Sequence, residues 1–155
     1  MNLQTILELW ATHSPTLLHS RESNKRIFFV RGVAAVPDFT HTLPRNISPC
    51  ILFDLHHDVE YISEGKKNVA YTIYFCAKSA GMKPNDDLFA VDAIETTEKL
   101  IEEFREFIIR RQDDNDFDFL SISTEFSTFP YGPLFDGWFA TACALNKIER
   151  ISLCK

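Results

Sequence analysis

The sequence predicts an α+β fold in one domain, residues 1–155, with a mainly antiparallel sheet of four to five strands packed with two helices, in the order α-β-β-β-α-β-β. Three observations lead to this prediction. Apolar residues recur on one helical face near the N-terminus and again within residues 93–112. Between these two segments, two adjacent apolar runs flank a short polar turn, which is the pattern of a β-hairpin.

The first predicted helix covers residues 2–13. Leu3, Ile6, Leu7 and Trp10 recur at the spacing of a single helical face. A polar stretch follows, and the apolar run at residues 27–30, ended by Gly32, predicts a buried strand.

Residues 36–49 contain three prolines, Pro37, Pro44 and Pro49. We interpret this composition as excluding a regular helix or a central strand, and we expect a long surface loop. Long loops in compact domains are often functional, so Phe39 and Leu43 become candidate contacts with another subunit or a partner. A plain irregular connection is the alternative.

The central hairpin is predicted from residues 50–62 and 68–79, joined by a turn that contains Gly65. Residues Ile51, Phe53 and Leu55 alternate with residues of the other face, and residues 69–76 alternate in the same way. Both faces carry apolar or aromatic side chains, so we expect helices or loops to cover the sheet on both sides.

The second helix is predicted at residues 93–112, with Asp92 and Glu95 in the pattern of a capping box. Two closing strands are expected at residues 117–122 and 138–145. The connection between them is rich in proline and glycine and carries Phe129, Tyr131 and Phe135, which we interpret as candidate contacts with a subunit or partner. A small satellite core packed over the sheet edge is the alternative.

Charge and composition exclude several classes of protein. The chain has 16 Lys and Arg against 22 Asp and Glu, for a net charge of -6 without a basic cluster, which argues against a nucleic-acid binder. No apolar run approaches the ~18 residues of a membrane span. The N-terminus lacks the basic start of a signal peptide, and the four cysteines form no CxxC pair. We therefore expect a cytoplasmic protein with buried, reduced cysteines.

No catalytic motif is present, and we expect no enzyme activity, no metal and no cofactor. The densest group of possible ligands is His56-His57-Asp58, which supplies too few groups for a zinc site. The acidic run at residues 113–118 lacks the glycine and glutamate of a calcium loop. The alternative is a small enzyme or ligand-binding protein whose site forms around His56, Asp58 and Asp136.

The order of elements and several local phrases resemble the tail terminator, or tail-completion, proteins of long-tailed phages. The resemblance covers residues 3–145. Its parts are the opening helix, Pro49-Cys50-Ile51-Leu52-Phe53, Tyr71-Thr72-Ile73-Tyr74-Phe75, the helix at residues 94–111 and Asp136-Gly137-Trp138. The loop at residues 36–49 and the tail after Asn146 depart from it.

This resemblance implies a homo-oligomeric ring, commonly a hexamer, that caps the tail tube and joins it to the head connector. The implied partners are further copies of the chain, tail-tube proteins and head-connector proteins, without sequence-specific nucleic acid or membrane. The implied location is the host cytoplasm during assembly and then the virion. A component of a contractile injection system would share the ring and is a second alternative.

Overall fold

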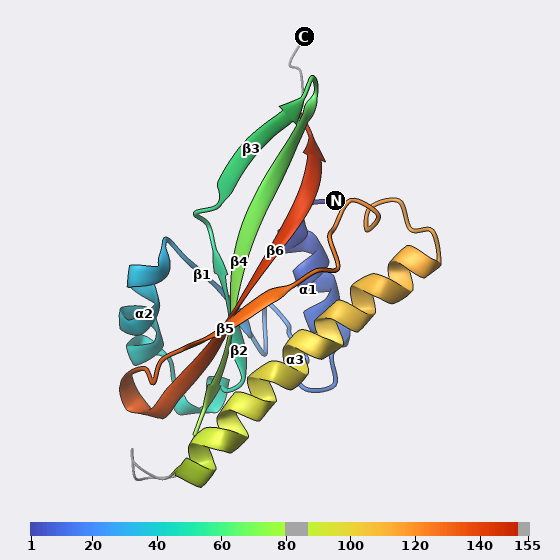
Figure 1. The fold of residues 1–155 in the computed structure, drawn as a ribbon. Helices are drawn as coiled ribbons and strands as arrows, with labels where there is room; N and C mark the ends of the chain where they lie inside the picture. Colours follow the sequence, from blue (N-terminus) through green and yellow to red (C-terminus); the bar gives the residue numbers. More distant parts are fainter. Residues whose placement is uncertain (80–86, 152–155) are drawn as a thin grey trace.

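A computed structural model describes residues 1–79 and 87–151 (Figure 1). The helices are α1 (Leu3–His13), α2 (Val36–Thr42) and α3 (Asp87–Asp113). The strands are β1 (Ile27–Val30), β2 (Cys50–Asp54), β3 (Asp58–Ser63), β4 (Lys66–Lys78), β5 (Ser127–Tyr131) and β6 (Trp138–Arg150). The fold is α+β, as predicted.

The centre of the sheet is the antiparallel pair β4 and β6, which are in register from Lys66 opposite Arg150 to Lys78 opposite Trp138. Two strands share the other edge of β4. Strand β2 pairs with its C-terminal half and β3 with its N-terminal half, both antiparallel. Strand β1 lies parallel to β2, and β5 lies antiparallel to β6. The sheet is therefore mostly antiparallel, as predicted, with β1–β2 as its parallel pair.

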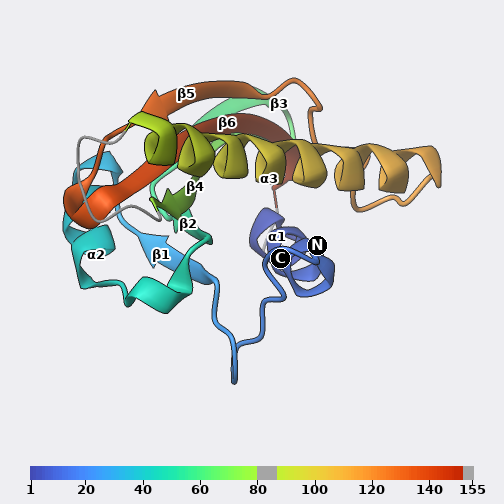
Figure 2. The same cartoon turned by 90° about the horizontal axis from the view of Figure 1, so that it is seen from below.

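Helices α1 and α3 cover one face of the sheet (Figures 1 and 2). The one-face stripe of α1 is buried as its spacing predicts, and Asn2 caps the helix by accepting a 2.8 Å hydrogen bond from the Thr5 backbone N–H. The Trp10 ring lies 5.0 Å from Phe104 of α3 and 6.2 Å from Phe75 of β4. These aromatic contacts join both helices to the sheet in one core.

The opposite face has a second, smaller core under α2. Val36 packs there against sheet residues that include Leu52, Tyr74 and Trp138, all of them buried. The expected two-sided cover is thus confirmed where α2 lies opposite α3. It is wrong for β3, in which all six residues are exposed.

The predicted count of two helices and four to five strands is wrong, because residues 1–79 and 87–151 form three α-helices and six strands. The run at residues 50–62 forms two strands, β2 and β3, which separate at residues 55–57 and pair with different halves of β4. Strand β6 continues to Arg150, so residues 147–150 belong to the sheet.

Helix α2 contradicts the prediction of an irregular loop at residues 36–49. Pro37 lies in the first turn of α2. A proline is tolerated there because the first helical N–H groups have no acceptor within the helix, and its fixed φ suits the helix. The other two prolines lie beyond the end of α2.

Two further boundaries are corrected. Residues 117–121 form turns, and Ile122 pairs with β6 through an isolated bridge to Lys147, so the predicted strand is not formed. Phe119 and Ile122 are buried three residues apart, and Gln112 donates 2.8 Å hydrogen bonds to both of their carbonyls. The strand is β5, within the segment predicted to be a connection, where Pro130 is tolerated because β5 is an edge strand. Helix α3 begins at Asp87, so Asp92 is not its N-cap.

Replacing Phe104 with alanine tests the aromatic core. Phe104 is fully buried between α1 and β4, so we expect Phe104→Ala to lower the free energy of unfolding by about 3–5 kcal/mol in urea titrations. Phe117→Ala is the control. Its ring is 75% exposed, and we expect a change within about 0.5 kcal/mol. Equal losses in the two variants would contradict this description of the core.

Candidate functional site: an exposed β-sheet arm

One end of the sheet projects beyond the helices (Figure 1). We call it the arm and define it as β3 with the paired residues 66–70 of β4 and 146–150 of β6. Its exposed apolar side chains are Val59, Tyr61 and Ile62 on β3 and Ile148 on β6. Tyr61 is 73% exposed, an unusual position for a large aromatic side chain in an isolated folded chain.

The arm forms because Gly65, with φ of +75°, allows the tight turn between β3 and β4. An irregularity in the pairing lies between Tyr61 and Ser63, at Ile62. Among the described residues, β3 pairs only with β4, so its other edge has no strand partner. An unpaired edge strand presents free backbone N–H and C=O groups with which another chain can pair.

A polar cluster around Glu149 connects the arm, on which Glu149 lies opposite Lys67, to Tyr71 just outside it. The Tyr71 hydroxyl donates a 2.5 Å hydrogen bond to Glu149, and Lys67 and Lys147 each approach the same carboxylate at 3.8 Å. Lys147 is buried, with its stem over the core and its ammonium toward Glu149. Burial first, and then the hydrogen bond to Glu149 and its charge, raise the pKa of Tyr71 well above 10.

A second exposed apolar surface lies in the turns that follow α3. We call it the turn patch and define it as Phe117 and Leu120, both exposed. It belongs to a different part of the chain from the arm. The turns are nevertheless joined to the β6 edge of the arm, because the Ile148 N–H donates a 2.9 Å hydrogen bond to the Ser121 carbonyl.

The contact residues predicted from the sequence occupy different environments. Phe39 and Leu43 are partly buried and pack against the core under α2. Tyr131 is partly buried, with its ring 5.8 Å from Tyr74 and its hydroxyl donating to the Val33 carbonyl. Phe129 is 45% exposed. The contact role of these residues stays a prediction; the side chain of Phe135, also predicted, lies outside the described part of the structure.

In the described residues, His56, Asp58 and Asp136 do not share a hydrogen-bond or ion-pair partner, so they do not form the alternative site. His56 lies beside Gly32, and Asp58 begins β3. Asp136 forms an ion pair of 2.9 Å with His41 of α2. In the described parts of the chain, no three His, Cys, Asp or Glu side chains gather closely enough to hold a metal ion.

The cysteines that the structure describes, Cys50, Cys76 and Cys143, are buried and free, as predicted. Burial raises the pKa of Cys143 to about 12, so this thiol is an unreactive part of the core. Cys154 lies outside the described residues. No described helix is long and apolar enough to cross a membrane.

Sequence reasoning missed the arm because it grouped β2 and β3 into one buried strand. The burial of β2 is complete, whereas β3 carries Asp58 and Glu60 at alternate positions. That acidic alternation is the signal that distinguishes an exposed strand from the apolar run before it.

No protein-family model and no curated protein sequence matches this chain.

Tyr71→Phe tests whether the polar cluster around Glu149 raises the pKa of Tyr71 on folding. A pKa raised on folding means that the folded protein holds the phenol proton more tightly than the unfolded chain does. The resulting stability is complete below pH 10 and is lost as the pH rises toward the higher folded value. In urea titrations above pH 10, we expect Tyr71→Phe to make the fall in stability shallower, by at most about 1.4 kcal/mol per pH unit.

The control for this experiment is Tyr61→Phe, which removes a hydroxyl from an exposed ring. We expect the alkaline slope of this variant to match that of the unmodified protein. An unchanged slope in Tyr71→Phe would show that folding does not raise the pKa of Tyr71.

Proposed function

We propose that this chain is a non-enzymatic assembly protein that forms a homo-oligomeric ring, in the manner of the phage tail terminators that it resembles. The observation that supports the proposal most strongly is the arm, in which every residue of β3 is exposed and three of the six are apolar. Burial of these side chains against another chain would remove from water the apolar surface that the isolated subunit exposes.

Ring geometry gives the two exposed surfaces complementary roles. A closed ring joins each subunit to the next by two different patches, one on each side of the contact. The arm supplies one patch through the free edge of β3, and the turn patch at Phe117 and Leu120 supplies a second apolar surface, in the segment that is bonded to β6. We propose that the arm of one subunit packs against the turn patch of the next.

The proposed role follows from this assembly. A ring of such subunits, commonly a hexamer in the family that the chain resembles, would cap a tail tube and join it to the head connector. Its partners would be other copies of the chain, tail-tube proteins and connector proteins. Shape complementarity and symmetry perform this function without a chemical step, which agrees with the separate environments of His56 and Asp136.

The solution mass tests the ring. Light scattering after size exclusion is expected to give a concentration-dependent approach to about six times 17.9 kDa. Tyr61→Lys is expected to lower the oligomer mass toward that of the monomer, because it places a charge in the apolar contact while leaving the core unchanged. Urea titration should give the same unfolding free energy for this variant within about 0.5 kcal/mol.

Val91→Lys is the matched control, since Val91 is an exposed apolar residue on α3, away from both the arm and the turn patch. We expect this variant to assemble like the unmodified chain. A monomer at every concentration, or an oligomer unaffected by Tyr61→Lys, would contradict the proposed contact.

A further inference from the structure

Polar side chains hold the connection between α1 and β1, residues 14–26, against the core. The Asn24 side-chain amide donates hydrogen bonds of 3.0 and 2.9 Å to the carbonyls of Leu17 and Leu18. Leu17 is buried in the main core. Leu18 has φ of +47°, a backbone conformation that a leucine adopts only at a cost in free energy. The bonds that close this connection therefore act against a strained residue.

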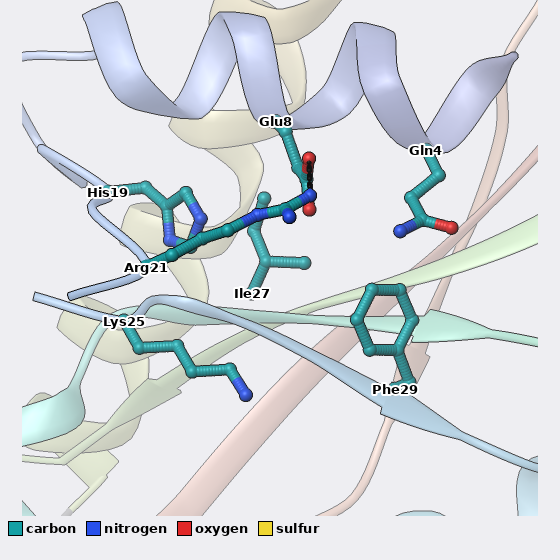
Figure 3. A pocket seen from close by; sticks show the side chains of 7 residues that line it. All are labelled: Gln4, Glu8, His19, Arg21, Lys25, Ile27 and Phe29. Atoms are coloured by element: carbon teal, nitrogen blue, oxygen red, sulfur yellow. Dashed lines mark hydrogen bonds and ion pairs between the residues drawn. The ribbon is translucent and has the colours of Figure 1, made fainter.

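His19 joins the connection to both neighbouring elements. Its backbone N–H donates a 3.0 Å hydrogen bond to the Ala11 carbonyl of α1. Its ring is 5% exposed, and the ring Nδ1 accepts a 3.0 Å hydrogen bond from the backbone N–H of Arg26, directly before β1. The ring lines a cavity of about 260 Å³, in which the β1 residues are Ile27 and Phe29, neither of them titratable (Figure 3).

This arrangement fits only a neutral ring. A histidine nitrogen accepts a hydrogen bond only when it carries no proton, so the proton of the His19 ring is on Nε2. A second proton would sit on Nδ1 and face the Arg26 N–H, donor against donor, and the bond would be lost. Burial also disfavours the charged ring, and it lowers the pKa of His19 below 6.5.

The charged groups around His19 come from α1 and from the connection itself. Glu8 of α1 raises the pKa of His19, whereas Arg21 and Lys25 lower it. Glu8 forms an ion pair with Arg21 (Figure 3). The Lys25 ammonium lies 5.2 Å from the centre of the Phe28 ring. Burial outweighs the attraction of the Glu8 carboxylate for a charged ring, so the ring is neutral at pH 7.

We propose that His19 is an acid-sensitive switch, whose protonation on Nδ1 releases residues 14–26 from β1 while the sheet stays folded. The closed form binds the ring proton more weakly than the open form, so the closed form loses stability as the pH falls below 6.5. Opening relieves the backbone of Leu18 and exposes Leu17. The switch lies within one chain and uses no residue of the arm, so it does not depend on ring assembly.

Hydrogen exchange of the Arg26 amide tests the switch. NMR on the full chain gives its protection factor between about pH 7.5 and 5, corrected for the intrinsic rate at each pH. We expect this protection to fall below pH 6.5, by at most about tenfold for each pH unit, because opening takes up one proton. Amides of β4 and β6 are expected to keep their protection over the same range.

Three variants identify the titrating group. His19→Asn keeps an acceptor near the position of Nδ1 but does not titrate, so protection of Arg26 should no longer depend on pH. His13→Asn, which changes an exposed histidine of α1, is the matched control and should keep the fall. Glu8→Gln should also keep the fall and extend it to lower pH, because without this carboxylate the closed form binds the proton more weakly.

Circular dichroism checks that the variants fold. If His19→Asn does not fold, the profiles of the unmodified chain and of Glu8→Gln decide. Protection of Arg26 that changes by less than about twofold across the range would overturn the proposal. So would a fall that persists in His19→Asn, a fall abolished by Glu8→Gln, or an equal fall in the amides of β4.

Discussion

The rest of the structure depends on the register of β4 against β6. Both strands are 13 residues long and pair over their full length. Because side chains alternate between the two faces of a sheet, this one register decides which residues enter each core. Tyr71, Ile73 and Phe75 of β4 point toward α1 and α3, whereas Tyr74 and Cys76 point toward α2.

The same pairing explains why the protein has an arm. The helices cover only the half of the β4–β6 ribbon to which β2 and β5 are added, so the other half extends past them with β3 as its edge (Figure 1). Tyr71, just outside the arm, donates a hydrogen bond to Glu149 of the arm, and the buried Lys147 lies 3.8 Å from the same carboxylate. The apolar side chains of β3 stay exposed beyond this cluster.

The elements whose apolar residues recur over several turns or alternations were predictable from the sequence. The stripe of α1 and the alternation of β4 determine both fold class and core, because each repeats a burial period several times. Helix α2 was not predictable from its three prolines, since the effect of Pro37 depends on its position within the first turn. The arm and the cavity at His19 depend on which half of β4 each strand joins and on how a polar connection folds back. Those are tertiary contacts that local patterns do not report.

The central claim is that the arm is a contact between chains. Amide hydrogen exchange, measured by mass spectrometry across a dilution series, tests it most directly. The account predicts that amides of β3, residues 58–63, exchange slowly at high protein concentration and faster on dilution, while those of α1 remain equally protected. Concentration-independent exchange throughout β3, in samples whose mass shows an oligomer, would contradict the claim.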